Sequence, residues 1–408
     1  MLNCSVREFG AVGDGVTMDT QAIQKALDAC HAAGGGRVTI EGGRYLSSTI
    51  QIKSGVELHL ASDGVLVASD RTADYPEIKS DIWNWQLAPR RNSRCFIYAE
   101  GASRIAITGR GMIECPGARV CELYNSTLWK YRRKEEHFPP RMVLLVCCTD
   151  VVLRDFTIKD AAAGWATWIL GCRDVNVDNV TMDADLDLPN SDGLHINCCQ
   201  DVTVSNCRIR TGDDALIIRA YTSVLKNPTP CERIAVTNCT LTSHSSGIRL
   251  AWANDGIMRN CVLSNITITD SMVGIAGVLP FPLDPANPKS DQGPDATLIE
   301  RIYFNNIILN RIWGEPIKLA VAPGADITAI RDLSFSNIHS VSRLAPQFLG
   351  AEDCPLQNIT IDNAVFTLSS LEDYPGRKSD TSGYGNLRKE PVIRYVENLL
   401  LQNVRVNC

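Results

Sequence analysis

Three aspartates lie close together near the middle of the chain, in short motifs that could carry out acid–base chemistry. Asp192 belongs to the motif Asn-Ser-Asp-Gly, and Asp213 and Asp214 belong to the motif Gly-Asp-Asp. Crowded carboxylates disfavour one another's ionisation, so one can hold a proton near neutral pH while another stays charged. Hydrolysis of a glycosidic bond needs such a pair, because an acid protonates the leaving oxygen while a carboxylate activates water or attacks carbon. We therefore expect all three to be catalytic, although turn-forming aspartates or a calcium site would also produce such motifs.

Other polar residues are expected beside these acids. His244 follows a repeated asparagine by six residues, much as Asp213 follows another by seven, and a histidine there could tune the ionisation of the aspartates. Arg219 and Arg249 lie just past the acids on successive predicted strands, where they could bind a carboxylate or sulfate of a substrate or could neutralise the aspartates. We assign Asn190, Arg219 and Arg249 to substrate binding, and we expect neither a metal nor a cofactor.

A degenerate repeat predicts how these residues are positioned. Its core is apolar-x-apolar-x-Asn, as in Val175–Asn179 and Val202–Asn206, and Asp155 takes the asparagine position in an earlier copy. The eight repeated asparagines are residues 179, 206, 238, 265, 306, 337, 363 and 403. Alternation with period two predicts strands, and units whose shortest spacings are 26 and 27 residues cannot enclose a core alone, so they must stack. We expect an all-β, single-stranded, right-handed parallel β-helix, in which the asparagine tolerates a left-handed bend and bonds to the next coil.

A β-helix would bring the acidic motifs together. Asp192 and Asp213 are 21 residues apart, a little less than one coil. They can therefore lie on neighbouring rungs, about 4.8 Å apart along the backbone. The alternative fold, an antiparallel β-sandwich, rarely repeats one polar residue in every unit and shows hairpin-turn signals that are scarce here.

Two kinds of segment depart from the repeat. Residues 18–33 predict an amphipathic helix, with Asp19 or Thr20 as N-cap, that covers the open end of the coil. Four segments rich in proline, aromatic or charged residues are expected to be loops flanking a binding groove: residues 70–94, 115–140, 220–231 and 279–297. Their aromatic side chains could stack on sugar rings or cover the core: Trp83, Trp85, Trp129 and Tyr131. Residues 1–408 then form one domain.

Composition narrows the classes of function. With 21% charged residues and a formal charge of −6, the chain lacks the basic balance of a nucleic-acid-binding protein. No run of 18 apolar residues predicts a membrane span. The first residues lack the basic and apolar regions of a signal peptide, which predicts a cytoplasmic protein, or a secreted one if a leader has been removed. We expect most of the 16 cysteines to be small buried residues in a reducing compartment rather than a disulfide framework. The sequence does not determine an oligomeric state.

The motifs together resemble glycoside hydrolase family 28, the polygalacturonase family of the pectin-lyase-like β-helix superfamily. The likeness covers nearly the whole chain, from Phe-Gly-Ala-Val-Gly-Asp-Gly at residues 9–15 to the Asn-x-Asp-Gly and Gly-Asp-Asp motifs in the family's order and spacing. It implies an inverting hydrolase with a water nucleophile and with Asp213 as general acid. Asp192 and Asp214 would position and deprotonate the water. His244, here in Ser-His-Ser instead of Gly-His-Gly, would be the family's histidine.

The chain departs from the family in one motif. Polygalacturonases carry Arg-Ile-Lys one rung after the histidine, where it binds the galacturonate carboxylate. Residues 273–278 here read Val-Gly-Ile-Ala-Gly-Val, with neither Arg nor Lys. The chemistry could be retained while the sugar differs, or Arg249 could substitute from the preceding rung. We expect a pectic or related oligosaccharide as substrate, uronate-containing ones included, with exo action if the long loops close one end of the groove.

Two other functions suit the same fold. A calcium-dependent polysaccharide lyase would use clustered acids, which the alternating Asp183, Asp185 and Asp187 could supply, and an Arg or Lys base. A non-catalytic carbohydrate-binding β-helix would not need Asp213 beside Asp214.

Overall fold

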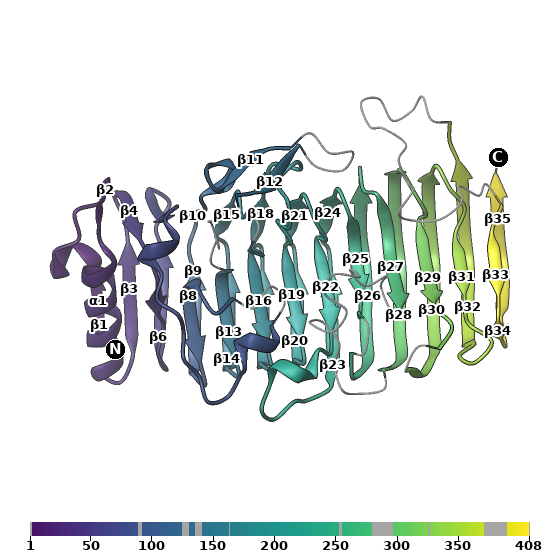
Figure 1. The fold of residues 1–408 in the computed structure, drawn as a ribbon, viewed down its shortest axis with the longest axis horizontal. Coiled ribbons are helices and arrows are strands. Elements are labelled where there is room, and N and C mark those ends of the chain that lie inside the picture. The colour runs from purple at the N-terminus through teal and green to yellow at the C-terminus, as the bar shows by residue number, and fades with distance from the viewer. Residues whose placement is uncertain are drawn as a thin grey trace.

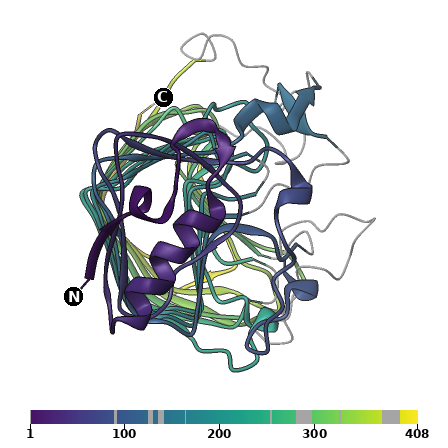
Figure 2. The ribbon, with the colours of Figure 1, turned by 90° about the vertical axis from the view of Figure 1, so that its left-hand side faces the viewer.

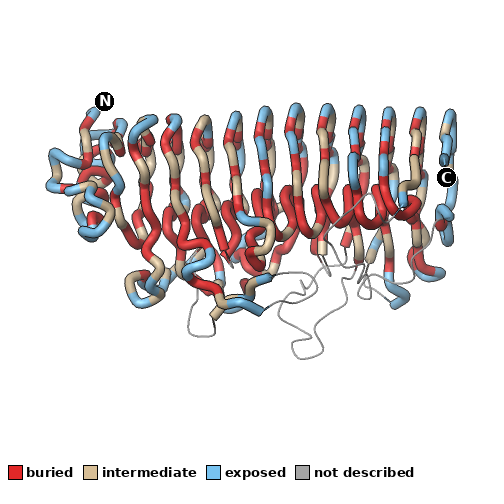
Figure 3. Tube along the Cα trace, turned by 90° about the horizontal axis from the view of Figure 1, so that it is seen from above, coloured by how far each residue is buried: buried red, intermediate tan, exposed pale blue. Residues whose placement is uncertain are grey.

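Alternating apolar residues form strands whose apolar side chains point into a continuous coil. In β17 (Arg173–Asp178) and β20 (Gln200–Ser205) the valines are buried and the residues between them are exposed. Val175 pairs with Val202 in parallel register, so like side chains stack from coil to coil. The result is a right-handed parallel β-helix with one core along its length, as predicted (Figures 1 and 3).

The computed structural model describes residues 2–88, 92–124, 130–134, 141–162, 164–252, 255–279, 297–324, 327–370 and 390–407. An 11-stranded parallel sheet forms one wall of the coil and carries the site described below. Its strands are β5 (Ile50–Gln51), β8 (Cys95–Glu100), β13 (Arg141–Val146), β16 (Thr167–Leu170), β19 (Leu194–Asn197), β22 (Leu216–Arg219), β25 (Ser246–Leu250), β27 (Val273–Leu279), β29 (Ile317–Val321), β31 (Gln347–Leu349) and β33 (Val392–Arg394).

A 22-stranded sheet forms the rest of the wall and bends once in each coil. Its strands are β17 and β20 together with β1 (Leu2–Ser5), β2 (Asp14–Met18), β3 (Gly36–Ile40), β4 (Gly43–Ser47), β6 (Val56–Leu60), β7 (Gly64–Ala68), β9 (Ser103–Thr108), β10 (Met112–Glu114), β14 (Thr149–Arg154), β15 (Thr157–Lys159), β18 (Thr181–Asp183), β21 (Arg208–Thr211), β23 (Cys231–Thr237), β24 (Thr240–Ser243), β26 (Ile257–Thr269), β28 (Thr297–Ile312), β30 (Ile327–Ser342), β32 (Leu356–Leu368), β34 (Val396–Glu397) and β35 (Leu400–Asn407). In the later coils the strands on both sides of the bend join into one long strand.

The repeated asparagines occupy this bend. All eight have φ between 51° and 57°, the left-handed conformation that short polar side chains tolerate best. Some bond directly up the stack: Asn306 Nδ2 donates to Asn265 Oδ1 at 2.7 Å, and Asn363 Nδ2 donates to Asn337 Oδ1 at 2.6 Å. Others bond to a neighbouring side chain, as Asn206 does to Asp178 at 2.7 Å. The predicted conformation and stacking role are both confirmed.

Helix α1 (Thr20–Ala32) lies across the N-terminal end of the coil, as predicted (Figure 2). Its buried face consists of Ile23, Ala26, Leu27 and Cys30. Asp19 stands at the N-cap position, as one of the two predicted candidates, but its carboxylate accepts from the amides of Val12 at 2.7 Å and Gly13 at 3.0 Å and not from the helix. No helix among the described residues is long and apolar enough to cross a membrane.

Three of the four expected loops are described in large part, and they project from one side of the coil (Figures 2 and 3). They carry short elements: η2 (Thr72–Asp74), η3 (Trp85–Leu87), η5 (Gly117–Val120), the antiparallel pair β11 (Cys121–Leu123) and β12 (Tyr131–Arg133), and η6 (Thr222–Val224). Trp83 is 3% exposed and packs edge-on against Trp168, so it covers the core instead of offering a sugar platform. Trp129 and residues 280–296 of the fourth loop lie outside the described residues.

The cysteines behave mainly as core residues. All 15 that the structure describes carry free thiols, and 14 of them are buried. Burial raises the pKa of Cys261 to about 12, which keeps that thiol protonated and unreactive at neutral pH.

Candidate active site

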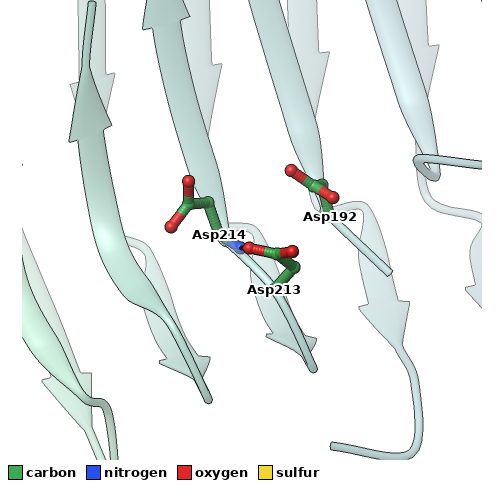
Figure 4. A group of neighbouring side chains, drawn as sticks. All are labelled: Asp192, Asp213 and Asp214. Carbon is green, nitrogen blue, oxygen red and sulfur yellow. Dashed lines mark hydrogen bonds between the residues drawn. The ribbon is translucent and has the colours of Figure 1, made fainter. Parts of the chain in front are cut away.

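The three aspartates lie in the turns that lead into two neighbouring strands of the 11-stranded sheet. Asp192 precedes β19 by two residues, and Asp214 precedes β22 by two residues. These strands pair in parallel with Leu194 opposite Leu216, so Asp192 and Asp214 occupy equivalent positions on adjacent rungs. The rung partner of Asp192 is therefore Asp214, and Asp213 projects from the turn beside them (Figure 4).

A glycine allows these two rungs to approach closely. The amide of Gly193 donates to the carbonyl of Asp214 at 3.0 Å. A Cβ at Gly193 would lie 2.3 Å from the carbonyl oxygen of Ala215. Because this oxygen belongs to the backbone, rotation of a side chain could not remove the clash. The glycine of the Asn-x-Asp-Gly motif thus has a packing reason, because it keeps Asp192 in line with Asp214.

The side chains of the aspartates converge on one point. One carboxylate oxygen from each lies within 4.8 Å of one from each of the others. Asp192 and Asp214 are 6% and 5% exposed, whereas Asp213 is half-buried. Three carboxyl groups this close together have the spacing of a site that shares a proton or a cation.

Directed hydrogen bonds fix two of the three carboxylates. Oδ1 of Asp214 accepts from the Ser245 hydroxyl at 2.8 Å and from the Ser246 amide at 2.9 Å. Oδ2 of Asp213 accepts from Asn190 Nδ2 at 3.1 Å. Asn190 was predicted to bind substrate, and the structure places it beside the three aspartates, where its amide donates to Asp213.

A histidine that the sequence analysis did not select holds the third carboxylate. His195 Nε2 lies 3.0 Å from Asp192 Oδ2, and the imidazole stacks on Trp165 with ring centroids 3.8 Å apart. Burial, and then the positive charge of Arg219, lower the pKa of His195 well below its usual value, so the ring is neutral. Alternation in the sequence could have identified His195. In β19 it stands between the inward-pointing Leu194 and Ile196, so its side chain points outward, three residues after Asp192.

These residues line a cavity of about 220 Å³ on the outer face of the 11-stranded sheet. Its wall is formed by Trp165, Asn190, Asp192, His195, Asp213, Asp214, Ile217, Arg219, Arg249 and Trp252. The predicted catalytic aspartates and substrate-binding residues therefore meet at one hollow, which has carboxylates on one part of its wall and guanidinium groups with an indole on another.

The comparison with known families agrees with this geometry. Residues 30–368 match the model of the glycosyl hydrolases family 28. The chain belongs to this family. It is 25% identical over 224 residues to a probable polygalacturonase of Vitis vinifera, covering 53% of this chain but only 44% of that protein. It is 23% identical over 375 residues to an exopolygalacturonase of Zea mays, covering 88% and 82% of the two chains. The crystal structure of a hyperthermoactive exopolygalacturonase from Thermotoga maritima shares the fold, with a TM-score of 0.74 at 18% identity over 100% of this chain and 92% of that one.

The two arginines of this family 28 glycoside hydrolase have different surroundings. Arg219 is bound by Asp255, which has no exposed surface, through Nε–Oδ2 at 3.1 Å and Nη2–Oδ1 at 2.8 Å. Arg249 is 2% exposed, and its guanidinium lies 4.4 Å from the ring centroid of Trp252. The positive charge of Arg219 is thus balanced by a carboxylate outside the cluster of three aspartates, whereas the sequence had suggested a substrate anion or the aspartates themselves.

His244 is not among the residues that line the cavity. Its Nδ1 lies 4.0 Å from Asp187 Oδ1, and its ring lies 5.5 Å from that of Trp313. Its backbone amide donates to the carbonyl of Thr211, so His244 lies on the coil next to the Gly-Asp-Asp turn. A role for His244 in tuning the acids stays a prediction.

The rung without the family's basic motif is followed by a lysine. Ala276 of β27 pairs with Arg249 on one side and with Lys318 of β29 on the other. Lys318 is 6% exposed, and its Nζ lies 3.1 Å from Glu315 Oε1. Lys318 is thus the next basic residue after Arg249 in this row, and its charge is balanced by Glu315.

The three acids suggested for a calcium-dependent lyase do not form a cluster with the spacing of metal ligands. Asp183 accepts from Lys159 Nζ at 3.0 Å and from Arg210 Nη1 at 3.2 Å. Asp185 accepts from the amide of Asp187 within its own turn. Among the described His, Cys, Asp and Glu residues, only the three aspartates of the cavity are spaced to share a cation.

Proposed function

We propose that this enzyme hydrolyses a terminal glycosidic bond of a pectic, galacturonate-containing oligosaccharide with inversion at the anomeric carbon. The observation that carries the proposal is the meeting of Asp192, Asp213 and Asp214 at the wall of one cavity. The names of relatives, which include polygalacturonase and exopolygalacturonase, favour this substrate and exo action.

Asp213 is suited to be the general acid because it is the most exposed of the three carboxyl groups. In the proposed step its proton passes to the glycosidic oxygen as the bond between that oxygen and the anomeric carbon breaks. The departing alcohol leaves toward solvent, and Asp213 regains a proton from water. A more buried acid would recover its proton more slowly.

Asp192 and Asp214 are suited to hold the attacking water between them. Two hydrogen bonds of about 2.8 Å from one water place the acceptor oxygens about 4.5 Å apart, and the oxygens of this cluster lie within 4.8 Å of one another. The water oxygen attacks the anomeric carbon, and one water proton passes to either carboxylate. One molecule of water is thereby added across the bond that breaks.

The spacing of the carboxyl groups in a glycosidase is related to whether it inverts or retains the anomeric configuration. Inverting glycosidases ordinarily separate their two carboxyl groups by about 6.5–9.5 Å, and retaining ones by about 5–5.5 Å. Those ranges refer to whole carboxyl groups, and the nearest oxygens of the three groups here lie within 4.8 Å of one another. Inversion is consistent with this spacing because two aspartates share the water, so that no wide gap between a single base and the acid is required.

Arg249 and Trp252 are the proposed partners of the sugar. The guanidinium can bind a uronate carboxylate, and the indole beside it can pack on the apolar face of a sugar ring. Arg219 shapes the same wall while Asp255 balances its charge. A cavity of about 220 Å³ suits one terminal residue of a chain, which favours exo action.

The test is product analysis on a panel of oligogalacturonides and neutral galacto-oligosaccharides. We expect monosaccharide release from the acidic substrates, a first-formed anomer opposite to that of the substrate by ¹H NMR, and equal rates after EDTA treatment. A retained anomer would refute inversion and leave hydrolysis standing. Unsaturated products that absorb in the near ultraviolet, or loss of activity with EDTA, would instead favour the lyase. Turnover of neutral substrates only would refute the uronate.

A further inference from the structure

His195 lies directly behind one of the proposed water-binding carboxylates. Its Nε2 is 3.0 Å from Asp192 Oδ2, and the two side chains are 4% and 8% exposed. The other ring nitrogen, Nδ1, is buried and has no hydrogen-bond partner among the described residues. A proton on Nδ1 would therefore be unsatisfied, whereas a proton on Nε2 is donated to Asp192.

Trp165 holds the imidazole in this orientation. The two rings are parallel to within 16° at a centroid distance of 3.8 Å. The guanidinium of Arg141, itself 1% exposed, lies 4.3 Å from the centroids of both Trp165 and Trp168. The ring of His195 is thus fixed by a buried stack that Arg141 of β13 and Trp168 of β16 support.

The backbone of Trp165 is in an unfavourable conformation. Its φ is 59°, a left-handed value that costs a bulky residue of order 1–3 kcal/mol. Its carbonyl accepts from the amide of Met142 at 3.2 Å, which ties it to β13. Strain of this kind persists where the surrounding structure enforces it, and here its effect is to set the indole against His195 at the cavity wall.

We propose that His195, clamped by Trp165, is a positioning residue that donates Nε2–H to Asp192 and so fixes the plane in which Asp192 binds the attacking water. This inference rests on the proposed hydrolysis. The charged groups that face the imidazole are Asp192 in the preceding turn, Arg141 on β13, and Asp214 and Arg219 at the two ends of β22. With two guanidinium groups among them and little solvent, the ring stays neutral.

Two substitutions separate the donor from the ring. His195→Phe retains an aromatic ring to stack on Trp165 but cannot donate, whereas His195→Gln places an amide donor near the position of Nε2. We expect kcat to fall about ten- to hundredfold in His195→Phe, the typical effect of losing a hydrogen bond to a charged group, with KM within about twofold. The acidic limb of its kcat profile should move to higher pH, because a carboxylate without its donor is harder to ionise. His195→Gln should recover most of the rate. His339→Phe, on the exposed face of β30, is the matched control and should be unchanged.

A second measurement does not depend on turnover. ¹⁵N NMR of histidine-labelled protein should show His195 as the neutral Nε2–H tautomer from pH 5 to 8. A ring that titrates in this range, or that carries its proton on Nδ1, would overturn the proposal whether or not a substrate is found. An active His195→Phe enzyme with a normal pH profile would also overturn it. Failure of the wild type on every pectic substrate would instead count against the proposed function, and the thermal midpoint of each variant shows whether it is folded.

Discussion

Arg219 donates two parallel hydrogen bonds to Asp255, and Asp255 also accepts from the amides of Ala220 and Trp252. The pair ties the end of β22 to the turn after β25, so it holds the wall of the cavity from the rear. Asp255 is completely buried. Asp255 therefore balances the charge of Arg219 from behind the cavity wall, and a substrate-binding role for Arg219 stays a prediction.

Replacing Arg219 by Met should destabilise the fold more than it alters substrate choice. The change leaves the carboxylate of Asp255 buried without its cation, which typically costs about 3–5 kcal/mol. Thermal and chemical denaturation of Arg219→Met would measure it, and adding Asp255→Asn should restore part of the loss. A variant that keeps the wild-type melting midpoint would contradict the structural role.

Asp213→Asn should abolish hydrolysis while leaving binding intact. The amide is nearly isosteric but has no proton to give, and the loss of a general acid lowers rates by about 10²–10⁴. Titration calorimetry with an oligogalacturonide should give an affinity close to that of the wild type. Asp174→Asn, at an exposed position of β17, is the control and should keep full activity. Equal turnover by Asp213→Asn would remove Asp213 from the mechanism.

Arg249→Ala should discriminate acidic from neutral substrates. If the guanidinium binds a uronate carboxylate, its loss removes a charge-assisted interaction and should raise KM for acidic oligosaccharides about tenfold or more. Neutral substrates should be affected much less. Arg208→Gln, on the exposed face of β21, serves as the control. Equal effects on both substrate classes would show that Arg249 does not recognise a carboxylate.

The depressed pKa of His195 predicts how stability depends on pH. The folded ring stays neutral, while the unfolded ring takes up a proton near pH 6.5. The unfolded state therefore binds more protons than the native state below pH 6.5, and the free energy of unfolding should fall with decreasing pH in that window by up to about 1.4 kcal/mol per unit. His195→Gln should lack this component. If the free energy of unfolding of the wild type and of the variant changes equally between pH 7 and 5, the lowered pKa of His195 is refuted.

Asn306 offers a test of the ladder at the bend. Ala at its φ of 55° carries a conformational cost of about 1–2 kcal/mol and also loses the bond to Asn265. Gly at the same position loses only the bond. Asn306→Ala should therefore lower the unfolding free energy about 2 kcal/mol, and Asn306→Gly about half as much. If the two variants lose the same unfolding free energy, the left-handed backbone conformation does not explain the asparagine at this position.

The sequence predicted the fold and the acid cluster because both follow from one periodic pattern. Asparagine at a constant point of each unit revealed the coil, and the coil placed Asp192 near Asp213 and Asp214. A second row of left-handed residues was not predicted, since it is occupied by changing types such as Asp201, Arg233, Asn260 and Asn358.

The remaining site residues depend on side-chain directions that spacing does not encode. His195 was overlooked in favour of His244 because positions were compared only with the repeated asparagine, whereas alternation in β19 and the closeness of Asp192 in the sequence pointed to His195. Asp255 follows Arg219 by 36 residues, in a turn with no repeat signature, so nothing in the pattern linked them. Buried pairs formed between turns are the part of this site that required coordinates.

The distance along the chain from one asparagine of the bend to the next varies from 26 to 41 residues, yet the strands at the bend stay paired in parallel, as Ile266 does with Ile307. The inserted residues that the structure describes, such as 220–231, lie on the outside of the coil (Figures 2 and 3). Loops bordering the cavity can therefore be lengthened, exchanged or transplanted between relatives without moving the acids. Loop sequences can diverge while the arrangement of the three aspartates is inherited unchanged, and a protein engineer can use the same separation.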